Sequence, residues 1–468
     1  MAFLSFLDRE RTIAPTNYNR WLVPPAALAI HLSIGQAYAF SVFNLPLSKL
    51  IGGASAAPDD WKLSTLGWIF SVAIIFLGLS AAIWGAWLER VGPRKAMFAS
   101  ACCFGGGFLL GSVGISTHQL WLLILGYGVL GGIGLGLGYI SPVSTLIKWF
   151  PDRPGMATGM AIMGFGGGAM VASPLSVLLL AHFKASATHG LAETFVTMGI
   201  GYFLFMMIGV FLVRLPASAD TRNTAERPLP HTMEFRSGAA AAPAAAAGAT
   251  MRQVPVSEAW RTKQFWLLWV VLLCNVTAGI GVLGQASAMI QEVFPGRISA
   301  AAAAGFVGLL SLANMGGRFF WSSTSDKIGR KATYMIFFAL GALLYFGVPT
   351  IGTSSVGIFV TLYAIILTMY GGGFATIPAY LRDLFGTVQV GAIHGRLLTA
   401  WSTAGVLGPV LVNYIREYQI AHGVAKAASY NTTMFIMAGL LIVGFIANSL
   451  VRPLTVAAAM PAAKPVAA

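Results

Sequence analysis

Charged residues are scarce in this chain of 468 residues: only 9% are Asp, Glu, Lys or Arg, whereas 57% are hydrophobic. A soluble domain carries about 25% charged residues, so a soluble protein of this length could not cover its surface. Cysteine is also rare. The three cysteines, Cys102, Cys103 and Cys274, lie inside apolar runs, which excludes a disulfide scaffold and a zinc module. These shortages point to a membrane protein.

Long apolar runs recur along the whole chain. Each contains roughly 20 residues, enough to cross about 30 Å of hydrocarbon as a helix. A helix is required because every backbone polar group must be satisfied internally in lipid. The sequence therefore predicts an all-α integral membrane protein. We expect twelve transmembrane helices, at 21–48, 65–88, 95–116, 120–147, 155–182, 193–214, 264–291, 302–321, 332–352, 356–380, 392–415 and 432–451.

The net charge of +14 resembles that of a nucleic-acid-binding protein, but its distribution indicates another role. The cations lie in short stretches between the apolar runs, and most fall on the side that holds both termini. The positive-inside rule then places both termini in the cytoplasm, with the chain crossing the cell (inner) membrane many times. The lipid bilayer is the expected surrounding, and no nucleic-acid partner is expected.

The longest polar stretch, 215–262, divides the chain near its middle. It contains a run of mostly alanine at 238–250, which is typical of a flexible linker. We therefore expect an N-terminal six-helix bundle (1–214), a cytoplasmic linker (215–262), a C-terminal six-helix bundle (263–452) and a cytoplasmic tail (453–468). A monomer is expected.

One loop motif occurs twice, once in each half of the chain. A second segment is repeated at nearly the same offset, with Gly155–Gly159 in the first half and Gly391–Gly395 in the second. Topogenic charge explains the repeated bases but not the repeated acid and glycine. Glycine permits a tight turn, and an acid at a helix terminus can pair with a base or cap a neighbouring helix. The first motif contains Gly85, Glu89, Arg90, Gly92 and Arg94, and the second contains Asp326, Lys327, Gly329 and Arg330.

Both loops resemble the signature G-x-x-x-D-R-x-G-R-[RK] of the major facilitator superfamily, with Glu89 in place of the usual Asp in the first copy. The resemblance covers nearly the whole chain. It implies two pseudo-symmetric six-helix bundles that rock around a central site near the midplane. It also implies that the loop residues form a conformational gate that holds one of the alternate states.

Arg318 is the one cation inside an expected span, about 12 Å from the loop that holds Asp326. Its side chain leans toward the helix N-terminus, further into the bilayer. A buried arginine costs at least about 3 kcal/mol and needs an anion or a water-filled cavity, unless it snorkels to the interface. No Asp or Glu lies well inside any span. An anionic substrate is therefore the natural counter-ion, and a carboxylate fits the planar guanidinium.

Other polar residues in the spans are candidates for the same site. His31 is either a proton carrier or a structural hydrogen bonder. Asn314 lies one helical turn before Arg318 and could orient it. Three tyrosines with glycine neighbours suit a compact polar pocket, although packing explains each of them equally well: Tyr38, Tyr139 and Tyr370.

Three stretches resemble the oxalate/formate antiporter family and its monocarboxylate-transporter relatives: Gly35–Val42, Lys148–Arg153 and Leu312–Arg318. The resemblance implies that Arg318 binds the substrate carboxylate and that Tyr38 and Tyr139 line the cavity. The oxalate exchanger of that family also has a lysine in span 11, where this chain has Trp401. A dianion would leave one charge uncompensated beside a single cation. We therefore expect a small monocarboxylate (formate, lactate or pyruvate) rather than oxalate.

The sequence leaves some alternatives to this function open and disfavours others. Oxalate/formate exchange remains an alternative, and anion exchange and proton symport both fit the expected carrier. A cationic-drug/proton antiporter usually needs an acid in a span, and none is visible. An enzyme is not expected, because no metal-spaced or nucleophile-base cluster is present, and we expect no cofactor and no metal. A non-transporting sensor has little support in the linker and tail.

Overall fold

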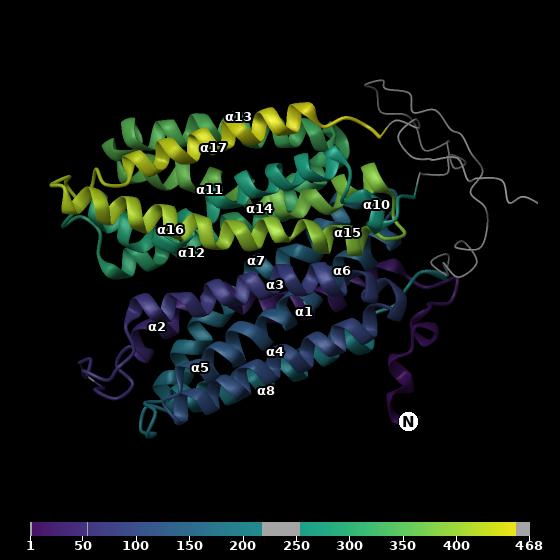
Figure 1. The fold of residues 1–468 in the computed structure, drawn as a ribbon, viewed down its shortest axis with the longest axis horizontal. Helices are drawn as coiled ribbons and strands as arrows, with labels where there is room; N and C mark the ends of the chain where they lie inside the picture. Colours follow the sequence, from purple (N-terminus) through teal and green to yellow (C-terminus); the bar gives the residue numbers. More distant parts are fainter. Residues whose placement is uncertain (1, 54, 218–252, 455–468) are drawn as a thin grey trace, which may run out of the picture.

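The computed structural model describes residues 2–53, 55–217 and 253–454 (Figure 1). Most of the expected linker and tail therefore lie outside the described residues. The first half contains α1 (Pro24–Ile34), α2 (Ser41–Leu47), α3 (Leu63–Val91), α4 (Pro93–Ser116), α5 (Leu120–Leu123), α6 (Gly132–Trp149), α7 (Pro154–His182) and α8 (Leu191–Leu212). The second half contains α10 (Val256–Ala259), α11 (Lys263–Val293), α12 (Ala300–Ile328), α13 (Arg330–Thr350), α14 (Val356–Phe385), α15 (Val390–Leu397), α16 (Thr399–Ala421) and α17 (Asn431–Leu450).

The expected all-helical membrane fold is confirmed. Among the described helices, 10 are long and apolar enough to cross a membrane, or up to 11 if the bent pair Arg20–Ala39 and Ser41–Leu47 forms one span. The remaining long helix is α12, which has 29 residues but carries Arg318, Asp326 and Lys327. Each of the twelve expected spans coincides with a long helix or with helices that follow one another directly.

The helices form two bundles that lie against each other (Figure 1). Helices α1 to α8 make one bundle and α11 to α17 the other. They meet where α7 packs on α12 and where α3 packs on α15 and α16. We call the end at which α3 meets α4 and α12 meets α13 the motif end, and the other the opposite end. The first described residues and the last described residues lie at the motif end (Figure 1).

The first span is broken near its middle, and the break positions a candidate site residue. Helix α1 ends at Ile34 and is followed by the 3₁₀ turn Gly35–Ala39, and the span bends by 44° before α2. Gly35 lies tightly on α7, because a Cβ added to it would be 2.4 Å from the carbonyl oxygen of Phe165. Tyr38 lies in this turn and points toward the second bundle, where its hydroxyl meets that of Tyr370.

Candidate functional site

Arg318 is fully buried between the two bundles, at 0% exposure. Its Nε donates a hydrogen bond to Asn314 Oδ1 (3.2 Å), and its Nη1 donates to the carbonyl oxygen of Ile162 on α7 (3.2 Å). Asn314 thus orients the guanidinium as expected from its spacing. The side chain does not snorkel to an interface. Its Nη2 makes no hydrogen bond of normal geometry within the described part of the chain, although the Tyr38 and Tyr139 hydroxyls interact with the guanidinium. One donor of this buried cation therefore has room for a better acceptor.

Two phenylalanines from different bundles flank the guanidinium. The Arg318 Cζ lies 5.6 Å from the ring centroid of Phe165 and 5.2 Å from that of Phe374. Such contacts stabilise a desolvated cation by about 2 kcal/mol. Gly166 makes room for the group, since a Cβ there would lie 3.0 Å from Nε. The ion pairs between described residues all involve other side chains, so protein carboxylates in these ranges leave the Arg318 charge uncompensated.

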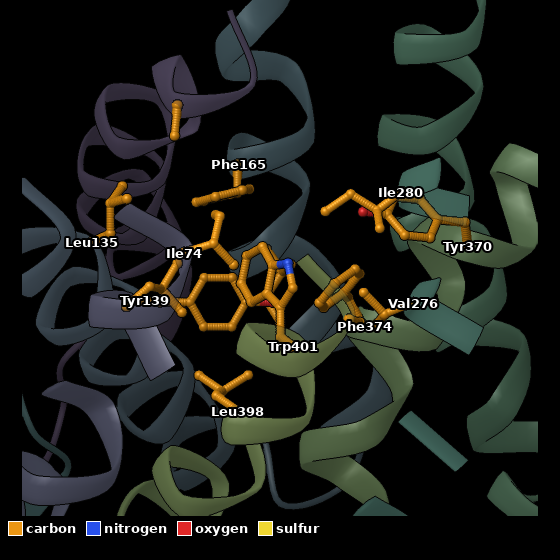
Figure 2. Packing of buried hydrophobic residues seen from close by; sticks show 14 of the residues in the cluster. Ile74, Leu135, Tyr139, Phe165, Val276, Ile280, Tyr370, Phe374, Leu398 and Trp401 are labelled. Atoms are coloured by element: carbon orange, nitrogen blue, oxygen red, sulfur yellow. The ribbon is translucent and has the colours of Figure 1, made fainter. Parts of the chain in front are cut away.

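Trp401 is the centre of an aromatic cluster beside Arg318. Figure 2 shows its indole between Tyr139 of the first bundle and Phe374 of the second. Its ring centroid lies 5.2 Å from that of Tyr139, 5.4 Å from that of Phe165 and 4.5 Å from that of Phe374. Neither the Trp401 Nε1 nor the Tyr139 hydroxyl has a hydrogen-bond partner among the described residues. Buried polar groups are rarely left unpaired, so these two groups are candidate contacts for a ligand.

The remaining candidate tyrosines join the same cluster from both sides. The Tyr38 and Tyr370 hydroxyls are 3.1 Å apart and form a hydrogen bond between the bundles. Tyr38, Tyr139 and Tyr370 all interact electrostatically with Arg318. The structure therefore brings together the residues that the sequence analysis selected from five separate spans. Their role in binding stays a prediction.

His31 also reaches this cluster, together with a histidine that the sequence analysis did not select. The His31 ring lies 5.4 Å from the Tyr139 ring, and its Nδ1 is 3.2 Å from the Ala27 carbonyl oxygen. The His394 ring centroid lies 5.9 Å from that of the Tyr139 ring. His394 is 1% exposed. The sequence signal that could have found it is its position inside the repeated segment Gly391–Gly395.

The second loop motif joins the bundles at the motif end. The carboxylate of Asp326 accepts hydrogen bonds from the backbone N–H groups of Gly155 and Met156, both at 2.8 Å. These groups belong to the first turn of α7. Arg330 pairs with Asp326 (2.6 Å) and with Asp383 (3.2 Å) within the second bundle. The guanidinium therefore fixes the carboxylate that caps α7.

The first motif makes the equivalent contact in the reverse direction. Glu89 Oε1 accepts a hydrogen bond from the backbone N–H of Gly391 on α15 (3.0 Å), and Lys148 donates to Glu89 Oε2 (2.7 Å). Gly85 permits the approach, because a Cβ there would lie 2.8 Å from the Ala392 Cα. The glutamate in place of the usual aspartate still reaches the partner helix.

The other motif residues have different roles. Arg94 is buried and donates to the carbonyl oxygens of Phe6, Val210 and Val213, so it fixes the end of α8 and the first residues of the chain. Arg90 and Lys327 are exposed. The motif glycines make the tight turns, with φ of 86° at Gly92 and 88° at Gly329.

The hydrogen bonds between the bundles are unevenly distributed along the molecule. At the motif end, Asp326 and Glu89 make the contacts above, and Arg382 donates to the Pro151 carbonyl oxygen (3.0 Å). Among the described residues, two hydrogen bonds between the bundles lie nearest to the opposite end. One joins Tyr38 and Tyr370, and the other runs from Ser402 to the Ile74 carbonyl oxygen (2.8 Å). The structure is therefore closed at the motif end.

The chain is similar to known transporters over most of its length. A sequence model of the Major Facilitator Superfamily matches residues 18–409. The chain is 27% identical to the oxalate:formate antiporter of Oxalobacter formigenes over 396 residues, covering 83% of this chain and 83% of that protein. It is 24% identical to the apicoplast pyruvate carrier 1 of Toxoplasma gondii, covering 73% of this chain and 68% of that protein.

The fold is also that of solved transporter structures. The structure of the fucose:proton symporter FucP of E. coli superposes with a TM-score of 0.62, covering 92% of this chain and 100% of that chain. Its sequence identity is 14%, so this likeness concerns the fold alone.

Proposed function

This chain belongs to the major facilitator superfamily of secondary transporters, and we propose that it carries a small monocarboxylate of the formate, lactate or pyruvate class by alternating access. The observation that carries the proposal is the unpaired Nη2 of the fully buried Arg318. A carboxylate bound there would neutralise the charge and accept a hydrogen bond from the Nη2 N–H group. The Tyr139 hydroxyl and Trp401 Nε1 offer further donors, and the aromatic rings suit a short apolar body.

The charge of the site favours a monoanion. Of the described arginines and lysines, three side chains are buried: Arg94, Arg318 and Arg330. Arg94 and Arg330 lie at the motif end and have their own partners. One cation therefore faces the substrate, and the second carboxylate of oxalate would enter a desolvated aromatic cluster without a partner. The buried cation also disfavours a cationic drug as substrate.

Oxalate/formate exchange is a second candidate because of the similarity to the oxalate:formate antiporter. The similarity to the apicoplast pyruvate carrier 1 favours the monocarboxylate class. Trp401 is the residue on which the two candidates differ, since it occupies the place where the resemblance implies a lysine. The direct comparison of oxalate with monocarboxylates therefore decides between them.

The asymmetric closure supports a transport cycle in which the bundles separate at either end in turn. In the proposed cycle, the motif end is closed in the present arrangement, and the substrate enters and leaves the site from the solution at the opposite end. We assign the motif end to the cytoplasmic side of the inner membrane, because the basic loops gather there. Opening toward the cytoplasm would break the Asp326 and Glu89 contacts, which are the main polar ties at that end.

A counterflow assay in proteoliposomes tests the proposal. Liposomes loaded with unlabelled lactate, pyruvate, formate or oxalate are given the labelled compound outside, with wild type, Arg318→Gln and Arg261→Gln. Arg261 is exposed and far from the site in the sequence, so its variant is the matched control. We expect the monocarboxylates to exchange in wild type and in Arg261→Gln but not in Arg318→Gln. Preferred exchange of oxalate, or full activity of Arg318→Gln, would contradict the proposal.

A further inference from the structure

We propose that His31 and His394, which both lie near the ring of Tyr139, form the proton-binding site that couples carboxylate uptake to proton uptake. The inference rests on the proposed function and extends it, since it selects proton symport from the two modes that the sequence leaves open. The two histidines come from different bundles, His31 from α1 and His394 from α15. The pair therefore changes its geometry whenever the bundles rock.

Both imidazoles lie near the same tyrosine ring. The ring centroid of Tyr139 is 5.4 Å from that of His31 and 5.9 Å from that of His394. The two imidazoles also interact electrostatically with each other. Tyr139 contacts Trp401 and interacts with Arg318, so the trio lies directly beside the carboxylate site.

The hydrogen-bonding of the two rings argues against a purely structural role. Both side chains are buried, at 0% and 1% exposure. Among the described residues, the Tyr139 hydroxyl and both ring nitrogens of His394 have no hydrogen-bond partner, and His31 Nε2 makes no hydrogen bond of normal geometry, although the ring interacts with the Tyr139 backbone. A packing histidine normally has its nitrogens paired. Unpaired nitrogens in adjacent buried rings are what a site for protons and a bridging water requires.

The surrounding charges explain why a proton and a carboxylate would bind together. His31 faces Tyr139 of α6 and Arg318 of α12, and α7 presents Gly164 to it. His394 faces Tyr139 and His31. Glu89 of α3 accepts a hydrogen bond from Gly391, which precedes His394 on the same helix. A second positive charge beside Arg318 is unfavourable while the site is empty. A carboxylate on Arg318 removes that repulsion and lets an imidazole bind a proton.

The net charge of the site then stays constant through the cycle. The empty site carries the charge of Arg318 alone, and the site with a carboxylate and a proton carries the same net charge. Both forms can reorient without a change in buried charge. The step moves one proton and no electrons: a ring nitrogen lone pair accepts a proton from water on one side and returns it to water on the other.

The position of His394 supplies the release path. It lies between Gly391, whose N–H contacts Glu89, and Gly395, where a Cβ would lie 2.1 Å from the Ala81 carbonyl oxygen. Both are contacts between α15 and α3, and the first lies at the motif end. When the motif end opens, α15 leaves α3, so His394 leaves Tyr139 and meets water. The proton is therefore released on the same side as the carboxylate.

The test separates proton-driven uptake from exchange in the same proteoliposomes. Labelled lactate uptake is driven by an inward proton gradient, and the pH-sensitive dye pyranine in the lumen records proton entry. Counterflow of lactate at equal pH is measured in parallel. The variants are His31→Gln, His394→Gln and, as the matched control, His182→Gln, an exposed histidine at the end of α7. We expect wild type and His182→Gln to accumulate lactate with luminal acidification.

In His31→Gln and His394→Gln we expect gradient-driven accumulation and luminal acidification to fall to the level of empty liposomes. Counterflow should persist in His394→Gln, because His394 is not among the residues assigned to the carboxylate. Wild-type behaviour of both variants would overturn the inference, as would loss of counterflow together with uptake in correctly folded His394→Gln. If both variants misfold, the wild-type dye signal decides, because lactate entry without acidification overturns the inference. Failure of lactate, pyruvate and formate counterflow in wild type would refute the proposed function instead.

Discussion

Asp326 caps the first turn of α7 from the other bundle, with its carboxylate 2.8 Å from the N–H of Gly155. The N-terminus of a helix presents unpaired N–H groups and a partial positive charge, so an acid is favoured there. Glu89 repeats the relationship at Gly391 of α15. The two repeats seen in the sequence, the acidic loop motif and the glycine segment, are therefore the two sides of one contact that occurs twice.

Asp326→Asn is expected to weaken the closed motif end. The amide keeps one acceptor oxygen but loses the charge and leaves one backbone N–H of α7 unpaired. The loss of such a hydrogen bond costs about 1–3 kcal/mol. A coupling of that size shifts a two-state population about 5- to 150-fold. Spin labels can be placed at the exposed positions Arg90 and Lys327, one in each bundle. Pulsed electron paramagnetic resonance should then show a longer distance between the two labels in Asp326→Asn than in wild type.

Asp152→Asn is the matched control for this measurement. Asp152 pairs with Arg20 (2.8 Å) inside the first bundle, and both side chains are exposed. Exposed ion pairs contribute only about 0–1 kcal/mol. The label distance should therefore match wild type. An unchanged distance in Asp326→Asn as well would show that the carboxylate does not hold the bundles together.

Gly155→Ala should open the same end by a clash rather than by lost charge. The added Cβ would lie 2.1 Å from the Ser322 carbonyl oxygen, which is backbone and cannot move aside alone. The bundles must separate, so the spin labels should again report longer distances. Gly439→Ala is the control, since a Cβ on this α17 glycine meets nothing within 4 Å. Equal distances in the two variants would contradict this packing argument.

The sequence predicted the fold and much of the candidate site because its signals are local. Apolar runs mark the helices, and a cation such as Arg318 inside an apolar run is conspicuous. The repeated offset also indicated that the loop motifs have a role beyond topogenic charge. It could not indicate that Asp326 contacts Gly155 or that Glu89 contacts Gly391, because these contacts depend on how the bundles face each other.

The residues missed by the sequence analysis lie where tertiary structure decides. His394 occurs in a short segment near an expected helix start, and only the packing of α15 on α6 brings it to Tyr139. Phe165 and Phe374 are ordinary aromatic residues in apolar runs. Their contact with Arg318 follows from the meeting of α7, α12 and α14, which no periodicity in one helix predicts.

Asn314→Ala is expected to weaken substrate binding without abolishing transport. It removes the acceptor that fixes Arg318 Nε, so the guanidinium loses one of its two hydrogen bonds. A hydrogen bond to a charged group contributes about 1.5–3 kcal/mol, part of which the reoriented side chain recovers. The KM for the transported monocarboxylate in counterflow should rise. Asn413→Ala, which removes the exposed partner of Gln285, should leave KM unchanged, and equal KM values in both variants would count against the orienting role.

Trp401→Lys is expected to change the substrate charge that the site accepts. The indole is fully buried between Tyr139 and Phe374, so its replacement puts an ammonium and free volume beside Arg318. Two cations can neutralise both carboxylates of oxalate, whereas a monocarboxylate would leave one cation uncompensated in a desolvated site. Oxalate counterflow should therefore appear and lactate counterflow should fall. Trp401→Met creates similar volume without charge, so a gain of oxalate exchange in that variant as well would mean that size rather than charge excludes the dianion.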